Sequence, residues 1–168
     1  ANMSFGSSGD YDLVMTPEGP DLKPKPLSEE LVKRQQLMAA HPEILFSCSA
    51  GNEGYDTDVF PHYPSSYPID NVMSVSANDR DNKLTSWSGH GILSCDVAAL
   101  GKDVATIGAE EASHTASGTS YSAPYTSRLA GLILQLCPAL DGKTLRELIM
   151  KTVVVDYAKP LPVRSGGI

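Results

Sequence analysis

The segment ASGTSYSAP, residues 116–124, places a glycine and several small hydroxyl side chains directly before a strongly apolar run. Its hydroxyl residues are Ser117, Thr119, Ser120 and Ser122. Serine and threonine cap free N–H groups at the start of a helix, which is one interpretation of the segment. The other is that one serine is a nucleophile, placed where a helix N-terminus stabilises developing negative charge. The segment alone fits both interpretations.

A second segment that could take part in chemistry is SAGNEG at residues 49–54, where Asn52 lies in a loop framed by glycines. It follows an apolar run at 44–49 that is apolar on both faces, as strands buried in parallel sheets are. In open α/β sheets, active sites gather where strands end and helices begin. An asparagine amide and a backbone N–H at a helix start can both donate to an oxyanion. We therefore expect Asn52 and Ser120 to lie together.

The elements that must position these residues follow from periodicity and from helix-boundary residues. We predict strands at 1–6, 44–49 and 71–77, helices at 28–41 and 141–153, and a helix through 125–137 with Pro124 early in it and Ser120 at its N-terminus. A strand, a helix and another strand in succession indicate a βαβ unit. Residues 7–26, rich in proline and glycine, should be a surface loop insertion. Residues 91–108 should form a hairpin that turns near Gly101.

Composition limits the possible partners and compartments. The net charge of −7 argues against a nucleic-acid partner, because phosphate binding requires clustered Lys and Arg. No apolar run is long enough to span a bilayer. The three cysteines lie in apolar stretches and favour buried free thiols, which point weakly to a reducing compartment but do not fix the localisation: Cys48, Cys95 and Cys137.

Six segments resemble, in order, the motifs of the subtilisin-like serine proteases (the subtilases, peptidase family S8). NMSFG is similar to their substrate-binding strand, N-x-S-x-G, and SAGNEG to the loop that carries their oxyanion asparagine. GTSYSAP resembles their nucleophile motif, G-T-S-x-[SA]-x-P, and YPSSYPIDNVMSVSA, SWSGHG and DVAALGKDVAT are similar to segments between. The resemblance extends over residues 1–168. It implies a three-layer, doubly wound, mostly parallel α/β fold that is incomplete at its N-terminus, with this chain as the C-terminal part of one peptidase domain.

The resemblance also implies roles for individual residues. Ser120 would be the nucleophile of a serine endopeptidase, and its N–H and the Asn52 side chain would hold the oxyanion. The further residues implied to bind a polypeptide substrate are Ser4, Phe5 and Gly6 on one edge of the channel, Ser49, Ala50 and Gly51 on the facing wall, and Gly118 and Thr119 beside the nucleophile.

His62 aligns with the base of the pocket for the residue before the cut, where the family commonly has glycine. We expect this imidazole to narrow the pocket and to favour small, polar or acidic side chains.

The chain departs from the family pattern in lacking the aspartate and histidine motifs, D-[ST]-G and H-G-T-H. A serine without a base is a poor nucleophile. We therefore expect this chain to be inactive alone, and its partner to be an upstream segment of the same protease that carries the Asp and His. We interpret His41, His90 and His114 as ordinary surface or loop histidines. Leu100, where the family usually has proline, should alter one turn only.

Two alternative functions stay open. A sedolisin-like serine-carboxyl peptidase has a similar nucleophile motif, but such enzymes place an aspartate where this chain has Asn52. A non-catalytic, peptide-binding remnant of the fold is the other alternative. No cofactor is expected to be required. The acidic segments GDYDLV and YDTD could hold a structural calcium ion or could simply be solvated, so we assign no metal ligand.

Overall fold

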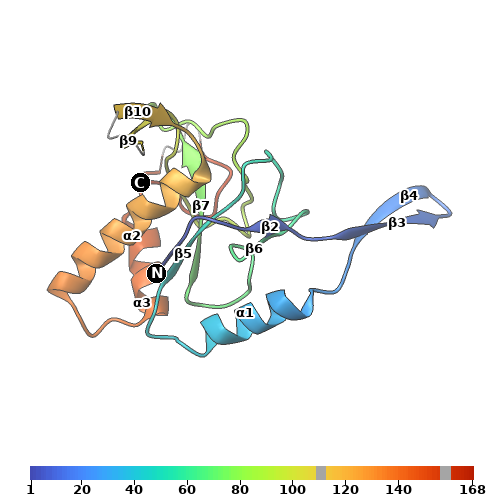
Figure 1. Ribbon diagram of the computed structural model, residues 1–168, viewed down its shortest axis with the longest axis horizontal. Helices are drawn as coiled ribbons and strands as arrows, with labels where there is room; N and C mark the ends of the chain where they lie inside the picture. Colours follow the sequence, from blue (N-terminus) through green and yellow to red (C-terminus); the bar gives the residue numbers. More distant parts are fainter. Residues whose placement is uncertain (109–112, 156–159) are drawn as a thin grey trace.

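The computed structural model describes residues 1–108, 113–155 and 160–168, and these residues form an α/β structure around a parallel sheet (Figure 1). The sheet has five strands within the described residues, in the spatial order β1 (Asn2–Met3), β5 (Phe46–Ser49), β7 (Val72–Asn78), β8 (Val97–Leu100) and β11 (Gly166–Gly167). Every pair of neighbours in it runs parallel. The predicted mostly parallel α/β fold is confirmed.

Helices lie on both faces of this sheet, and the residues of β5 and β7 are accordingly buried on both faces. The helices are α1 (Glu29–Ala39), α2 (Thr119–Leu136) and α3 (Gly142–Thr152). On one face, Phe46 and Cys48 of β5 pack with Met38 of α1. On the other face, the alternate residue Leu45 lies in the core cluster that α2 and α3 complete. Two cores separated by the sheet make the three layers.

Two of the three described helices begin at a side-chain cap. The Ser28 side chain accepts the N–H of Leu31 at 3.3 Å, and Glu29 and Glu30 occupy the first turn of α1. At α3, the Asp141 side chain accepts the N–H of Thr144 at 2.8 Å. Helix α2 differs, since its N-cap is Gly118 and has no side-chain cap. The N-terminus of α2 is therefore open to other polar groups.

The segment predicted as a surface loop at 7–26 contains regular structure, which corrects the prediction. β2 (Ser7–Ser8) pairs with β6 (His62–Tyr63), and β3 (Tyr11–Thr16) and β4 (Gly19–Pro24) form an antiparallel hairpin. The hairpin projects from the body as an arm, blue in Figure 1. Both of its strands are edge strands, where proline is tolerated, so the prolines do not prevent strand pairing.

The prediction of a hairpin within residues 91–108 is wrong. β8 belongs to the central sheet, whereas β9 (Val104–Ile107) pairs with β10 (Ser113–Ala116) outside it. The burial of each strand explains the difference: Val97, Ala98 and Ala99 of β8 are buried, as a strand with layers on both sides requires. β9 is only half buried in an alternating pattern, which suits a two-stranded ribbon at the surface.

The cysteines also differ in part from the prediction. Cys48 and Cys95 are buried free thiols, but Cys137 is exposed at the C-terminal end of α2. Burial raises the pKa of Cys48 to about 12. Within the described parts of the chain, none of the helices has the length and apolar character that a membrane span needs.

Candidate active site

Two glycines shape the backbone at the carboxyl end of β5 and at the start of α2. Gly51 has φ +97° and Gly118 has φ +155°, values that side chains disfavour. The first turns the chain out of β5 into the loop of Asn52, and the second turns it into α2. A Cβ atom at Gly118 would lie 3.7 Å from the Asn52 Nδ2 atom. The two segments therefore meet at this edge of the sheet.

Thr119 holds the side chain of Asn52 in one orientation. The Oδ1 atom of Asn52 accepts hydrogen bonds from the Thr119 N–H at 2.9 Å and from its hydroxyl at 3.0 Å. Thr119 is fully buried, and its hydroxyl also lies 3.3 Å from the Gly51 carbonyl oxygen. Because the oxygen of the Asn52 amide is bound in this way, its nitrogen is the atom of the amide that is left to bind another group. Among the described residues, that nitrogen has no hydrogen-bond acceptor.

Ser120, the next residue of α2, is tied to the segment that follows β1. Its hydroxyl donates to the Ser4 carbonyl oxygen at 3.0 Å, and the Ser4 hydroxyl donates to the Ser120 carbonyl oxygen at 2.8 Å. Pro124 explains the second bond. In a regular helix the Ser120 carbonyl would accept the N–H of residue 124, which proline lacks. The carbonyl is thus free to accept the Ser4 hydroxyl.

The N-terminus of α2 supplies an unpaired donor beside these side chains. The first N–H groups of a helix have no acceptor within it, and the Ser120 N–H is one of them. The Thr119 N–H is already used by Asn52. Among the described residues, the Ser120 N–H and the Asn52 amide nitrogen are therefore donors without an acceptor at this end of α2. Residues from three separate segments, Ser4, Asn52 and Ser120, are brought together here.

His62 lies between the segments 4–6 and 49–51, which the sequence predicts to form the two sides of the substrate channel. It is only 5% exposed. A Cβ atom at Gly51 would lie 2.9 Å from the His62 Cδ2 atom, and one at Gly6 would overlap the same ring. Glycine at both positions makes room for the imidazole, which is 3.2 Å from the Ser65 hydroxyl through its Nδ1 atom.

Burial lowers the pKa of His62, and the nearby Glu53 carboxylate and a hydrogen bond to the Ser49 backbone act in the opposite direction. Since the lowered pKa lies below the usual value for histidine, His62 is mainly neutral at pH 7. The imidazole can therefore take part in hydrogen bonds there without placing a full positive charge in the pocket.

The other residues expected near a substrate lie around this ring. Ser49 and Ala50 are buried, and the Ser49 hydroxyl lies 3.4 Å from the Met3 carbonyl oxygen. The Phe5 side chain is 53% exposed, and the Arg34 guanidinium lies 5.6 Å from the centre of its ring. The structure thus brings the segments 4–6 and 49–51 to the two sides of His62.

The Ser120 hydroxyl bonds to a main-chain oxygen and not to an imidazole. His41 pairs with Glu43 at 3.0 Å, and His90 lies 3.2 Å from the Ser88 carbonyl oxygen, so both make local contacts. His114 lies on β10 and is exposed. The positions of His41 and His90 and the exposure of His114 fit the interpretation of these three as surface or loop histidines.

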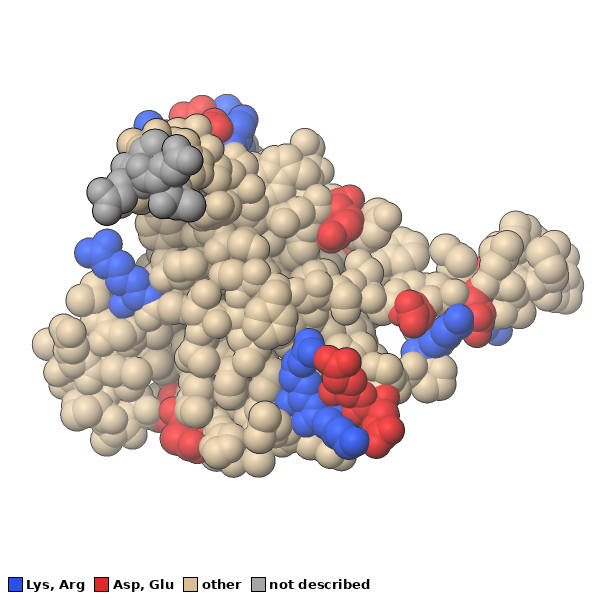
Figure 2. Space-filling view, in the orientation of Figure 1, with Lys and Arg blue, Asp and Glu red and all other residues tan. Residues whose placement is uncertain are grey.

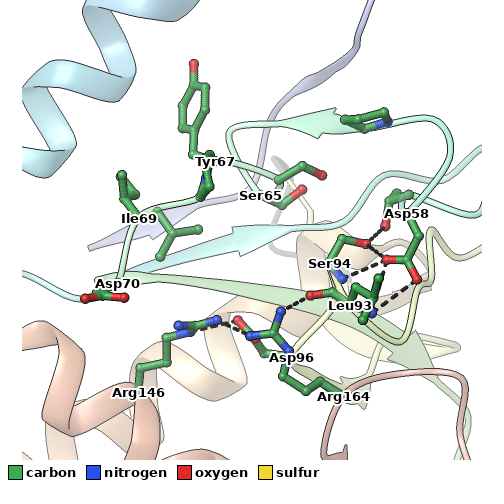
Figure 3. A pocket seen from close by; sticks show the side chains of 15 residues that line it. Asp58, Ser65, Tyr67, Ile69, Asp70, Leu93, Ser94, Asp96, Arg146 and Arg164 are labelled. Carbon is green, nitrogen blue, oxygen red and sulfur yellow. Dashed lines mark hydrogen bonds and ion pairs between the residues drawn. The ribbon is translucent and has the colours of Figure 1, made fainter. Parts of the chain in front are cut away.

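A separate cavity of about 390 Å³ lies at the N-terminal end of β8 (Figure 3). Its charged centre is Asp96, which is 1% exposed and precedes β8. The Arg146 guanidinium donates to both oxygens of Asp96, at 2.7 and 3.0 Å, and Arg164 lies 3.3 Å away. The Ser74 N–H donates to the same carboxylate at 3.0 Å. Because the buried Asp96 carboxylate is paired with two guanidinium groups and a backbone N–H, we assign this cluster to stability.

Two carboxylates in the acidic segments considered for calcium, those of Asp58 and Asp12, make contacts within the protein. Asp58 accepts the N–H groups of Leu93 and Ser94 and the Ser94 hydroxyl, as Figure 3 shows. These bonds hold the pKa of Asp58 below its usual value, although burial acts in the opposite direction. Asp12 pairs with Lys25 at 3.2 Å. Within 1–108, 113–155 and 160–168, no group of three acidic, histidine or cysteine side chains could hold a metal ion.

Comparison with known proteins shows the family and the fold of the chain. The model of the subtilase family of S8 peptidases matches residues 1–166. Among solved structures, the chain is similar to the prenylagaramide maturation protease PagA, with 24% identity and a TM-score of 0.73. That similarity covers 98% of this chain and 55% of the PagA chain, so this chain spans about half the length of that protein. No curated protein matches the chain.

Proposed function

This chain belongs to the subtilase family, and from that premise we propose that it supplies the nucleophile and the oxyanion-binding groups of a serine endopeptidase. Ser120 is the nucleophile. The observation that carries the proposal is the pair of hydrogen bonds from Thr119 to the Asn52 side-chain oxygen. They leave the Asn52 amide nitrogen and the Ser120 N–H as donors beside the Ser120 hydroxyl. Such fixed donors favour the charge that develops on a carbonyl oxygen under attack.

In the proposed reaction, the Ser120 oxygen attacks the carbonyl carbon of the scissile peptide bond. The carbonyl oxygen becomes an oxyanion and accepts hydrogen bonds from Asn52 and from the Ser120 N–H. The N-terminal end of the α2 dipole stabilises the same charge. The Ser120 proton requires a base, which an upstream segment carrying the Asp and His motifs would provide.

In this proposal, the hydrogen bond from the Ser120 hydroxyl to the Ser4 carbonyl oxygen belongs to the site without its base. When the base is in place, the hydroxyl turns toward it and releases the Ser4 carbonyl. That carbonyl can then accept an N–H of an extended substrate. The edge formed by Ser4, Phe5 and Gly6 would pair with the peptide as an added strand.

The pocket for the residue before the cut would lie between residues 4–6 and 49–51, with His62 at its base. A buried, mainly neutral imidazole there shortens the pocket and offers polar contact. We expect cleavage after small, polar or acidic residues. A peptide-library profile dominated by large aromatic residues at this position would contradict the role of His62.

Labelling with a serine-directed phosphonate tests the proposal. The full-length protease, with its Asp and His motifs, should be labelled at Ser120, and the Ser120→Ala variant should not be labelled. Ser122→Ala is a matched control, because Ser122 is a buried serine on the same turn of α2, and it should label like the parent. Label retained in Ser120→Ala would refute the assignment of the nucleophile.

The isolated chain of residues 1–168 should stay unlabelled under the same conditions, because it lacks the base. Stoichiometric labelling of that chain would contradict the proposed need for an upstream segment.

A further inference from the structure

The arm formed by β3 and β4, residues 11–24, has one apolar face and one polar face. Strand register places Leu13 opposite Leu22 and Met15 opposite Pro20, and directly opposite residues share a face. The alternate positions place Asp12 opposite Lys23 and Val14 opposite Asp21. Leu13, Met15 and Leu22 are 68%, 74% and 50% exposed.

An uncovered face of this kind indicates a binding surface. A two-stranded hairpin by itself is marginally stable in water. Removing large apolar side chains on one face from water lowers the free energy, so a partner that covers them is stabilised there. In the view of Figure 2 the charged side chains seen on the arm lie toward its base, and Glu18 lies in the turn between β3 and β4 at the outer end. The polar face includes Asp12, which pairs with Lys25 at 3.2 Å.

The base of the arm is fixed to the body, so the direction in which it projects is defined. The Gly9 N–H donates to the Pro61 carbonyl oxygen at 2.9 Å, and the Tyr11 hydroxyl donates to the Val59 carbonyl oxygen at 3.1 Å. The Tyr11 ring packs edge-on against Phe60, with 5.2 Å between ring centres. An anchored arm can present its apolar face at a constant position relative to the site.

The arm continues the edge on which a substrate would pair. The chain leaves Ser4, which contacts Ser120, passes Gly6 beside His62, and reaches Tyr11 five residues later. At about 3.3 Å per residue, this distance is at most about 17 Å. Because the pocket for the residue before the cut lies by His62, this direction leads away from the cut along the N-terminal part of the substrate.

We propose that the apolar face of the arm binds an apolar segment of the polypeptide substrate about five to ten residues before the scissile bond. The inference rests on the proposed function, because it takes the substrate direction from that site. Leu13, Met15 and Leu22 make the contact. Substrates with apolar residues in that segment should therefore bind more tightly than substrates that lack the segment.

A second copy of this chain is a poorer occupant of the face. Six-residue strands make a face about 20 Å long and about 10 Å wide, or about 200 Å². A stable protein interface buries about 800 Å² on each partner. A peptide strand needs much less area, because the neighbouring edge at Ser4–Gly6 adds main-chain hydrogen bonds.

The test uses the full-length protease and measures binding separately from hydrolysis. In the Ser120→Ala form, a fluorescent peptide that reaches ten residues before the cut, with leucines in the outer five, is titrated by anisotropy. The double variant Leu13→Thr, Leu22→Thr should weaken its binding by about tenfold or more, since two leucine contacts are lost. Threonine keeps the strand propensity of the arm. A matched pair on the polar face, Val14→Thr with Asp21→Thr, should change binding by less than about twofold.

A short peptide that ends four residues before the cut should bind equally to all three proteins. Equal binding of the long peptide to the parent and to the apolar-face variant would overturn the proposal. So would a dimer that this variant abolishes while peptide affinity is unchanged. Hydrolysis of the short peptide, measured in the parent with Ser120 intact, reports on the proposed function alone, so the two proposals fail by different observations.

Discussion

Replacing Thr119 by valine should lower the kcat of the full-length protease and leave its KM for the substrate nearly unchanged. Valine keeps the shape and the backbone N–H of Thr119 but removes the hydroxyl that lies 3.0 Å from the Asn52 oxygen. The N–H bond at 2.9 Å remains. Asn52 then keeps one of its two restraints, and its amide nitrogen is held less firmly toward the oxyanion.

The size of this effect follows from the bond that is lost. A neutral hydrogen bond is worth about 1 kcal/mol net, and about 1.4 kcal/mol changes a rate tenfold, so kcat should fall about fivefold. KM should change little, because the oxyanion forms only as the bond is attacked. Removing the donor itself, in Asn52→Ala, should cost about 10²–10³-fold, the size known for such an asparagine in a related subtilase.

Steady-state hydrolysis of a short chromogenic peptide measures both constants. Ser122→Ala serves as the control, since the Ser122 hydroxyl is buried without a hydrogen-bond partner among the described residues, and its loss should leave kcat unchanged. An unchanged kcat in Thr119→Val, or a raised KM with the same kcat, would refute the idea that Thr119 orients Asn52 for the transition state.

Three further predictions concern the rest of the molecule. Asp96→Asn should lower the free energy of unfolding by about 3 kcal/mol in urea, because Arg146 loses a buried carboxylate partner; an unchanged midpoint would contradict this. His62 has a lowered pKa, so its protonation favours the unfolded chain, and stability should fall as the pH drops below about 6.5; His62→Gln should flatten this slope in thermal melts from pH 7 to 5. Iodoacetamide at pH 8 should modify Cys137 in the folded protein but not Cys48, whose pKa is about 12; mass spectrometry that finds Cys48 modified would refute its burial.

Much of the sheet and of the site could be predicted from the sequence. The runs at 44–49 and 71–77 overlap β5 and β7, whose residues are all buried because helices cover both faces of the sheet. The helix beginning after Ser28 follows from its cap and its acidic first turn. The proximity of Asn52 and Ser120 followed from the rule that strand ends and helix starts share one edge of the sheet.

The missed features depend on tertiary contacts that local patterns do not encode. In the arm, the apolar run Leu13, Val14 and Met15 is too short to indicate a strand by itself, and the prolines and glycines around it favoured a loop. The exposure of Cys137 depends on where α2 ends relative to the core. The bond from Ser4 to the Ser120 carbonyl had one available signal, the missing N–H of Pro124, which only a count of helix acceptors would use.

The central claim is that the Asn52 amide and the Ser120 backbone N–H bind one oxyanion. A crystal structure of the full-length protease with a peptide boronic acid bound covalently to Ser120 measures this directly. We expect one boronate oxygen to lie about 2.7–3.1 Å from both the Asn52 Nδ2 atom and the Ser120 nitrogen. A boronate whose oxygens all point away from Asn52, or an adduct on a different residue, would contradict the account.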